Sequence, residues 1–389
     1  MRLAICAPVS LPALRRYLGP GDGSSCPQGL GGVPATQLAL ELLRRGWRLS
    51  IYTLDPGVTE RVDLEGPRLK VVVGPYRRAG RARDFFRTER AALRSAIAED
   101  GPDLVHAHWT YEFALAGIES GVPTIVSVHD WAPTILRLSP DPYRFMRLLM
   151  HFRSIREAHA TVAVSPYIQR ALSRATGRVS PVVPNALDDD LFVPEPRSFP
   201  SGPPRIVSIN NGFGKRKNVR VLLQAFGIVR AAHPEAVLQL VGSGYEPDGE
   251  AQRWASARGL GSGVRFLGER PYAEVHDLLR QAAILVHPSL EESFGMTILE
   301  AMAKRTPVIA GAHSGAVPWV LGQGQAGVLV DVRSAAAIAK AASGLLDRAS
   351  EWESYSRRGY EAAYERFRLT RVVDDYVSLY REFLAGGSR

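Results

Sequence analysis

The sequence predicts an α/β protein made of two doubly wound domains, each a parallel sheet with helices on both faces. Three observations support this fold class. The chain has 389 residues, which suits two or three domains of about 150 residues each. Short apolar runs of strand length alternate with helical patterns along most of the chain. Five prolines between residues 194 and 204 interrupt the alternation near the middle.

The first half of the chain predicts one sheet. Its first strand, at residues 3–7, precedes a helix at 33–45 in which Val33, Leu38 and Leu42 recur with helical period. Further β-rich runs lie at residues 49–53, 69–73, 104–107, 124–128, 161–164 and 181–183. Continuous apolar strands separated by helices are typical of parallel sheets buried on both faces.

The second half repeats the alternation. Strands are expected at residues 206–209, 237–241, 264–267, 284–286, 308–310 and 328–330. Helices are expected at residues 219–230, 249–258, 271–281 and 295–303, and residues 335–384 have a helical pattern throughout. In folds of this class, ligands bind at the carboxyl ends of the strands.

The proline cluster sets the predicted domain boundaries. Together with Ser198, Ser201 and Gly202, it has the composition of an interdomain linker. We therefore expect a first domain at residues 1–193, a linker at 194–204 and a second domain at 205–366. The last segment, residues 367–389, is expected to be a helix that returns to the first domain.

Composition excludes several classes of protein. The hydrophobic fraction of 46% and charged fraction of 22% are ordinary for a globular protein and exclude a disordered chain. Two cysteines, Cys6 and Cys26, cannot form a disulfide framework and suit a reducing compartment. No apolar run approaches the ~18 residues of a membrane span. Because prolines interrupt the N-terminal apolar run, we interpret it as a strand rather than a signal peptide, and expect a cytoplasmic protein.

The net charge of +9 is concentrated in two arginine-rich stretches, residues 76–94 and 137–156, which carry excesses of +5 and +4. Residues 143–156 form a basic amphipathic helix that suits an anionic membrane surface, or equally a core-packed helix with a solvated arginine face. Residues 77–94 could be a mobile loop leading into a helix. The chain contains no recognisable nucleic-acid module, and its aromatic residues are not interleaved with the arginines, so we expect no nucleic-acid partner.

Two glutamates give the strongest chemical signal. Glu292 and Glu300 are separated by seven residues, and Gly295 is placed to begin a helix directly after a strand. The free N–H groups and the dipole at such a helix N-terminus attract phosphate. The two carboxylates could each accept hydrogen bonds from hydroxyl groups of one extended ligand. By spacing alone, an ordinary amphipathic helix with two solvated glutamates fits equally well.

Three histidines suggest an alternative. His106 and His108 would point to one face of their strand, and His129 follows the next predicted strand. Imidazole is a ligand for zinc, but no cysteine or carboxylate with ligand spacing accompanies these residues. We therefore expect no metal site.

Residues 285–310 resemble the signature region of retaining family-four glycosyltransferases of the GT-B fold. They share the Glu-x7-Glu spacing in the context of Phe-Gly, Glu-Ala-Met and Pro-Val-Ile. Other segments match the family in the right order: Gly31-Gly32-Val33 and residues 102–108, 127–130, 183–188, 217–226, 241–244 and 264–268. The resemblance spans about residues 1 to 385.

The resemblance implies two Rossmann-like domains that face each other across a cleft. It implies transfer of a hexose from a UDP- or GDP-sugar, with retained anomeric configuration, to a lipid-linked or glycan acceptor in polysaccharide or glycoconjugate biosynthesis. The nucleotide sugar is a co-substrate, and no cofactor or metal is implied. With the two arginine-rich stretches on the acceptor side, we expect peripheral attachment to the inner face of the cytoplasmic membrane; the oligomeric state stays open.

The resemblance also implies roles for individual residues. Glu292 would hold the donor sugar, Glu300 the ribose hydroxyls, and His129 would lie beside the reacting sugar in a positioning and electrostatic role. The implied donor-binding residues also include Gly31, Gly32, Arg216, Lys217, Gly242, Phe294, Gly295, Met296 and Thr297. The implied acceptor-side residues are His108, Trp109 and Asp130.

The chain departs from the family pattern at two positions. Lys217 fits the family's lysine, but Gly212 stands five residues earlier, where the family has arginine. We expect Lys217 first and Arg216 second to meet the diphosphate, with Lys215 as the other candidate. Trp319 occupies a place where the family often has glutamate.

Two other functions remain open at this point. One is a sugar-nucleotide epimerase or hydrolase on a similar fold. The other is a non-enzymatic basic protein that binds nucleic acid or a glycan.

Overall fold

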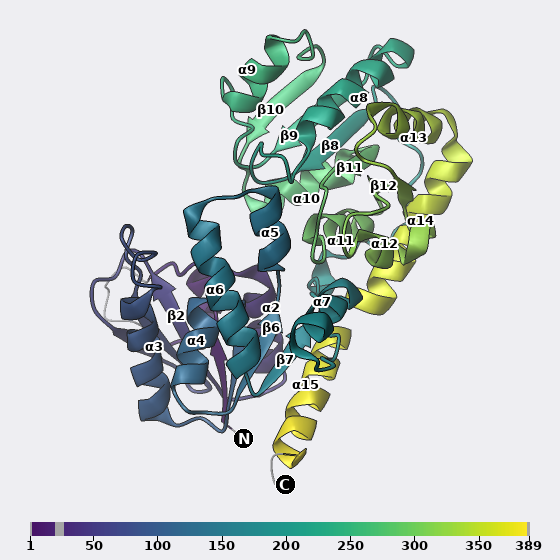
Figure 1. Cartoon of the computed structure of the whole chain (residues 1–389). Coiled ribbons are helices and arrows are strands. Elements are labelled where there is room, and N and C mark those ends of the chain that lie inside the picture. Colours follow the sequence, from purple (N-terminus) through teal and green to yellow (C-terminus); the bar gives the residue numbers. More distant parts are fainter. Residues whose placement is uncertain (1, 20–26, 387–389) are drawn as a thin grey trace. The chain divides into compact units, whose positions relative to one another are not determined.

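The computed structural model describes residues 2–19 and 27–386, so Cys26 lies outside the described residues. The chain divides into two compact units (Figure 1). Unit 1 comprises Met1–Ala186 and Leu369–Arg389, and unit 2 comprises Leu187–Arg368. Among the described residues, no helix is long and apolar enough to cross a membrane.

Unit 1 contains a seven-stranded sheet with the strand order β3-β4-β2-β1-β5-β6-β7. All neighbouring strands are parallel except the pair β3 and β4. The strands are β1 (Leu3–Cys6), β2 (Leu49–Asp55), β3 (Val62–Glu65), β4 (Leu69–Pro75), β5 (Leu104–His108), β6 (Thr124–Val128) and β7 (Ala160–Ala163).

Two strand predictions for unit 1 were wrong. The edge strand β3 was missed because its sequence, Val-Asp-Leu-Glu, alternates between half-buried and exposed positions and contains no apolar run. Residues 181–183 were expected to form a strand but contribute only an isolated bridge between Val182 and Ala163. The other six predicted strands of this half are present within one or two residues of their predicted ends.

Helices cover the sheet of unit 1, and the C-terminal helix is one of them. They are α1 (Leu11–Leu14), α2 (Val33–Arg44), α3 (Arg87–Asp100), α4 (Glu112–Glu119), α5 (Ala132–Leu138), α6 (Pro142–Glu157), α7 (Pro166–Thr176) and α15 (Leu369–Gly386). Val373 and Tyr380 of α15 belong to the same buried core cluster as Leu38 and Leu42 of α2. The last helix therefore completes the hydrophobic core of unit 1, because it covers apolar surface that would otherwise face water.

Unit 2 contains a six-stranded, all-parallel sheet in the order β10-β9-β8-β11-β12-β13. Its strands are β8 (Arg205–Ile209), β9 (Val237–Val241), β10 (Val264–Gly268), β11 (Ile284–His287), β12 (Val308–Gly311) and β13 (Val328–Val330). Its helices are α8 (Val219–Ala232), α9 (Glu250–Ser256), α10 (Tyr272–Gln281), α11 (Met296–Ala303), α12 (Val317–Val320), α13 (Ala335–Asp347) and α14 (Ala349–Phe367). All six strands lie within one residue of their predicted positions.

The proline-rich segment is held against unit 2. The Arg305 guanidinium donates to the carbonyl oxygens of Val193 and Pro194, and the Arg197 guanidinium donates to the carbonyl oxygen of Ala282. The boundary between the units falls after Ala186, whereas the sequence predicted it after residue 193. Residues 194–204 are therefore not a freely moving linker, because these hydrogen bonds hold the segment against unit 2.

Trp352 on α14 is the largest fully buried side chain, and its indole N–H donates to the carbonyl oxygen of Ala283 at 2.6 Å. Because Trp352→Ala removes the ring and leaves this carbonyl unpaired, we predict a loss of about 3–5 kcal/mol in the free energy of unfolding. Urea denaturation measures this loss. The matched control is Ile228→Ala at a 51% exposed position of α8, which should change stability by about 0.5 kcal/mol or less. Equal losses in the two variants would contradict the assignment of Trp352 to the core.

Candidate active site

The loop between β11 and α11 has the geometry of an anion-binding helix start. Gly295 caps α11 with φ +101°, no side chain caps the helix, and its first turn contains no acidic residue. The N–H groups of Met296 and Thr297 are among the first four of the helix, which have no partner within it. With the helix dipole, they favour a negatively charged ligand at this point.

Glu292 and Lys217 are directly bonded in unit 2. The Lys217 Nζ lies 2.6 Å from Glu292 Oε1, and His287 Nε2 lies 3.1 Å from the same oxygen. Burial alone would raise the pKa of Glu292, but Lys217, His287 and Arg216 hold it well below its usual value. Glu292 is therefore ionised at neutral pH, and its carboxylate can accept hydrogen bonds from ligand hydroxyl groups.

The neighbouring cations Arg216 and Lys217 pair with different glutamates. The Arg216 guanidinium lies 3.5 Å from Glu291 Oε2, so two consecutive basic residues face two consecutive acidic ones. Lys215 is exposed. Gly212, where the family has arginine, has φ +91° and its carbonyl oxygen accepts a hydrogen bond from the Tyr245 hydroxyl.

The backbone of Glu292 is fixed by the turn that contains Gly315. The Ala316 N–H donates to the Glu292 carbonyl oxygen at 2.8 Å, and a Cβ on Gly315 would lie 2.4 Å from that oxygen. Trp319, in the place of the family's glutamate, packs against Phe294 and Phe367 with ring centroids 6.2 and 5.4 Å away. The side chain of Phe294 is only 3% exposed, and it packs in the interior, where it supports α11. Only the backbone of Phe294 lies near the surface of the loop.

Glu300 lies in the middle of α11 and is buried. The Tyr272 hydroxyl of α10 donates to Glu300 Oε1 at 3.2 Å. Burial raises the pKa of Glu300 to about 7, against the opposing effects of Tyr272 and Lys304. Sequence reasoning missed Tyr272, because only the packing of α10 against α11 brings it to the glutamate.

Gly242 directly follows β9, where two loops approach closely. It has φ +116°, and a Cβ there would lie 2.0 Å from the carbonyl oxygen of Asn210. This position requires glycine because the loops after β8 and β9 touch. Gly242, which the family resemblance implies as a donor-binding residue, must therefore also be glycine for these two loops to pack.

The predicted acceptor-side residues gather in unit 1 at the carboxyl ends of β5 and β6. His108 ends β5 and is followed by Trp109, while His129 and Asp130 follow β6. These strands pair in register with His108 opposite Ser127. Trp109 has φ +63°, a strained conformation for a bulky side chain that is found mainly at functional sites.

The three histidines form buried hydrogen bonds, but only His108 and His129 are bonded to each other. His108 Nδ1 lies 2.9 Å from His129 Nε2, while His106 Nδ1 lies 2.7 Å from the Tyr380 hydroxyl. Burial lowers the pKa of both His106 and His129 to about 3, so these imidazoles are neutral. In the part of the chain that the structure describes, no group of three or more His, Cys, Asp or Glu side chains is arranged to hold a metal ion.

Gly31 and Gly32 directly precede α2, and their surroundings differ. Gly31 has φ +72° and open space around an added Cβ, whereas a Cβ on Gly32 would lie 2.3 Å from the Pro8 carbonyl oxygen. Gly31 could therefore leave room for a ligand, while Gly32 is needed for the packing of the turn itself.

A pocket of about 650 Å³ opens beside Asp130. The Tyr111 hydroxyl donates to Asp130 Oδ1 at 2.8 Å, and the Arg147 guanidinium lies 3.5 Å from the centroid of the Tyr111 ring. The remaining lining residues are Ala132, Ile135, Asp141, Pro142, Tyr143 and Arg144. Sequence reasoning missed Tyr111 and gave Arg147 to a membrane-facing or solvated surface, because it could not place α6 over the end of β5.

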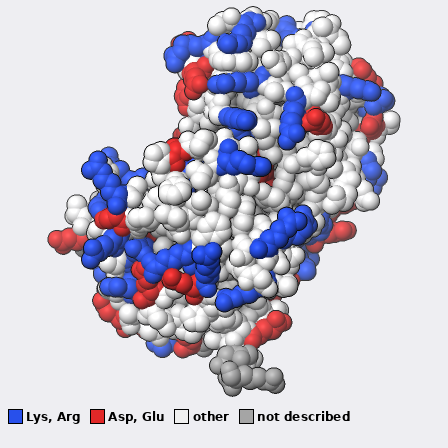
Figure 2. All heavy atoms as spheres, in the orientation of Figure 1, with Lys and Arg blue, Asp and Glu red and all other residues white. Residues whose placement is uncertain are grey.

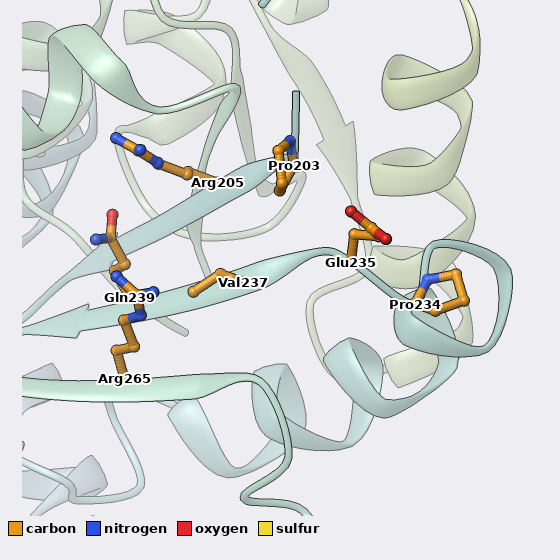
Figure 3. Close-up of a pocket in the computed structure, with 7 residues that line it drawn as sticks. All are labelled: Pro203, Arg205, Pro234, Glu235, Val237, Gln239 and Arg265. Carbon is orange, nitrogen blue, oxygen red and sulfur yellow. The ribbon is translucent and has the colours of Figure 1, made fainter. Parts of the chain in front are cut away.

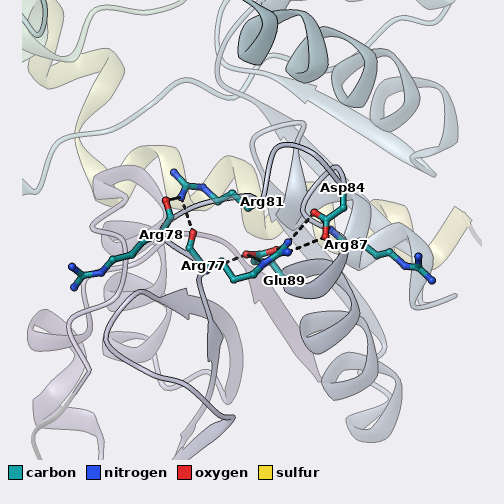
Figure 4. Close-up of polar contacts among 6 residues, drawn as sticks. All are labelled: Arg77, Arg78, Arg81, Asp84, Arg87 and Glu89. Carbon is teal, nitrogen blue, oxygen red and sulfur yellow. Dashed lines mark hydrogen bonds and ion pairs between the residues drawn. The ribbon is translucent and has the colours of Figure 1, made fainter.

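Four of the twelve arginines in the two arginine-rich stretches form ion pairs: Arg77, Arg90, Arg144 and Arg153. Arg77 forms ion pairs with Asp84 and Glu89, as Figure 4 shows, and Glu89 is fully buried. Arg90 and Arg153 both pair with Glu119, which lies outside these stretches. Basic and acidic side chains accordingly lie side by side on the face of unit 1 seen in Figure 2. From the sequence, residues 77–94 could be a mobile loop leading into a helix. Helix α3 does begin at Arg87, and the loop before it is held in place by the ion pairs of Arg77 with Asp84 and Glu89.

Comparisons with known proteins agree with this geometry. Residues 192–364 match the family "Glycosyl transferases group 1", and residues 32–191 match "Glycosyltransferase Family 4". The chain is 25% identical to N-acetyl-alpha-D-glucosaminyl L-malate synthase of Bacillus anthracis, over 93% of this chain and 97% of that protein. It is 26% identical to phosphatidyl-myo-inositol mannosyltransferase of Mycobacterium leprae, over 94% and 98% of the two chains.

A solved structure shows the same fold. Sucrose-phosphate synthase from Thermosynechococcus elongatus superposes with a TM-score of 0.77 and 21% identity, covering 99% of this chain and 100% of the other. The two family matches follow one another along the chain, and both units have Rossmann-like sheets. The protein belongs to the family-four glycosyltransferases and has the GT-B fold.

Proposed function

We propose that the protein is a retaining hexosyltransferase that uses a UDP- or GDP-sugar and acts on a lipid-linked or glycan acceptor in the synthesis of a polysaccharide or glycoconjugate. The observation that carries this proposal is the Lys217–Glu292 ion pair beside the uncapped start of α11, with Glu300 just over one turn into the helix. A carboxylate, a cation and free N–H groups are what the hydroxyl groups and diphosphate of a nucleotide sugar require.

The proposed reaction balances without a general base. The bond between the anomeric carbon and the diphosphate oxygen breaks, and its electron pair leaves with the diphosphate. The acceptor oxygen bonds to the anomeric carbon on the same face, and its proton passes to the departing diphosphate. Lys217, Arg216 and the first N–H groups of α11 stabilise the charge that develops on this group, so no metal is required.

His129 is better suited to positioning a substrate than to acting as a general base. Its pKa of about 3 makes it a weak proton acceptor at neutral pH. His108 Nδ1 lies within hydrogen-bond distance of His129 Nε2, and the Asn185 side chain also hydrogen-bonds the His129 ring, so the orientation of this imidazole is fixed. We assign His108 to holding that ring and His129 to orienting a substrate hydroxyl.

The acceptor is proposed to occupy the pocket beside Asp130. Asp130, Tyr111 and Arg147 supply polar contacts, whereas Ile135 and Tyr143 supply apolar ones. This mixture suits a glycan head group with an apolar attachment. The Mycobacterium leprae relative is named for a phosphatidyl-inositol acceptor, which supports an acceptor of this mixed chemistry.

Product analysis tests the proposal. With a labelled nucleotide sugar, the label should appear in an elongated acceptor. Recovery only as free sugar or as an epimer would instead indicate a hydrolase or an epimerase.

The first prediction concerns Glu292→Gln. Glutamine keeps the size and one acceptor oxygen, so Lys217 retains a partner and the fold should persist. Because the ionised acceptor for the donor hydroxyls is lost, we predict a fall in kcat/KM of about 100-fold or more. Initial transfer rates measure this, with thermal unfolding as the check on folding. The exposed Glu274→Gln on α10 is the matched control, and activity of Glu292→Gln at its level would refute the site assignment.

The second prediction concerns pH. Glu300 has a pKa of about 7, so its carboxylate becomes the dominant form as pH rises from 6 to 8. If the ionised form accepts the ribose hydroxyl groups, KM for the nucleotide sugar should fall over this range, and Glu300→Gln should abolish the change. Tyr272→Phe removes a donor that stabilises the carboxylate, so the inflection should move to higher pH. An identical profile in wild type and Glu300→Gln would contradict the role of Glu300.

The third prediction concerns membrane contact, which we propose for the exposed side of α6. Phe145 and Leu149 on this basic helix are 54% and 45% exposed, and Arg156 near the end of the same helix is also exposed. Replacing both apolar residues by serine should weaken binding to anionic vesicles by about 10-fold, since apolar insertion and charge act together. Vesicle co-sedimentation at low salt measures this. The control is Val179→Ser, an 83% exposed position; vesicle binding unchanged by the double substitution would argue against α6.

A further inference from the structure

The β8–β9–β10 edge of the unit 2 sheet differs on its two faces. On one face, Leu238, Leu240 and Phe266 pack with Ala251 and Ala255 of α9 in the main core cluster. The opposite face, at the beginning of the same strands, carries polar side chains. Strand register places Gln239 directly beside Arg265, and Arg205 beside Val237 on the same face (Figure 3).

Gln239 is a polar residue at a position in a parallel strand that is normally apolar. It occupies the centre of Val-Leu-Gln-Leu-Val in β9, which has a neighbouring strand on each side. Strands inside parallel sheets are normally apolar, because both of their faces are covered. Gln239 is only 7% exposed, and its side-chain oxygen has no hydrogen-bond partner in the described part of the chain. A buried carbonyl oxygen without a donor destabilises the protein unless a ligand supplies one.

The two arginines add positive charge without a counter-ion. Neither Arg205 nor Arg265 forms an ion pair with any carboxylate among the described residues; Arg205 donates only to the side-chain oxygen of Gln281. Both line a pocket of about 360 Å³ together with Gln239. Figure 3 shows these three side chains at one end of the pocket and Glu235 at the other. The charge at the glutamine end is therefore not neutralised locally.

We propose that this pocket binds a small phosphorylated compound that also carries hydroxyl groups, of the sugar-phosphate class. The guanidinium groups of Arg205 and Arg265 match the planar, paired recognition of a phosphate group. A hydroxyl group of the ligand donates to the unpartnered oxygen of Gln239. The volume lies within the range of ~300–1,000 Å³ of small-molecule sites.

The pocket is separate from the proposed donor site. Arg205 begins β8, Arg265 is the second residue of β10, and Gln239 lies at the centre of β9. Gly242, by contrast, follows the carboxyl end of β9. The pocket and the donor residues thus lie toward opposite ends of the same strands, and the inference does not rest on the proposed glycosyl transfer.

Calorimetric titration of the full chain tests the proposal with three probes: glucose 6-phosphate, inorganic phosphate and glucose. Glucose 6-phosphate should bind most tightly. Arg265→Ala should weaken its binding by about 10-fold or more, because an ionic contact to phosphate is lost. Gln239→Leu should weaken glucose 6-phosphate by about 5-fold and leave inorganic phosphate unchanged, since only the hydroxyl contact disappears.

Two control variants separate this pocket from other anion sites. Arg333→Ala removes an exposed arginine elsewhere in unit 2, and Lys217→Ala removes the cation of the donor site. Both should bind glucose 6-phosphate as the wild type does. Gln239→Leu should also raise the unfolding temperature of the ligand-free protein, because it removes the unpaired oxygen.

Four results would overturn the proposal. One is the absence of glucose 6-phosphate binding by the wild type. Another is unchanged binding in Arg265→Ala, or loss of binding in Lys217→Ala, which would place the ligand elsewhere. The last is inorganic phosphate binding as tightly as glucose 6-phosphate, which would show an anion site without sugar recognition.

Discussion

The ion pair between Lys217 and Glu292 is the interaction on which the candidate donor site depends. Two opposite charges, both largely removed from water, are stable there only because each is the other's partner and His287 provides a second contact. The pair keeps Glu292 ionised and places an ammonium group beside an uncapped helix start. A ligand with both hydroxyl groups and a diphosphate can engage both members, so the charges are in place before it binds.

Backbone geometry holds this pair in position. Gly315 allows the turn before α12 to lie against the Glu292 carbonyl, and Gly242 allows the loops after β8 and β9 to touch. Trp319 packs against Phe294 and Phe367, and this aromatic packing supports α11. Trp319 therefore contributes rigidity, where the family's glutamate would contribute a polar contact.

The sequence predicted the strands well and the long-range contacts poorly, for a physical reason. Buried parallel strands are continuous apolar runs that can be recognised locally, and the strand at residues 237–241 was located to the residue. Edge strand β3 has no such run. The Tyr272–Glu300 hydrogen bond and the Arg90–Glu119 ion pair join segments 28 and 29 residues apart, and only helix packing reveals them. For this reason the arginine-rich stretches were given more free charge than they have.

The central claim is that Lys217 holds the diphosphate, although the family's second cation at position 212 is replaced by glycine. The most direct measurement compares the affinities of wild type and Lys217→Met for a nucleoside diphosphate and for the matching nucleoside. If Lys217 holds the diphosphate, diphosphate affinity falls by about 10-fold or more, as expected for a lost charged hydrogen bond, while nucleoside affinity stays unchanged. Equal affinity of both proteins for the diphosphate would contradict it.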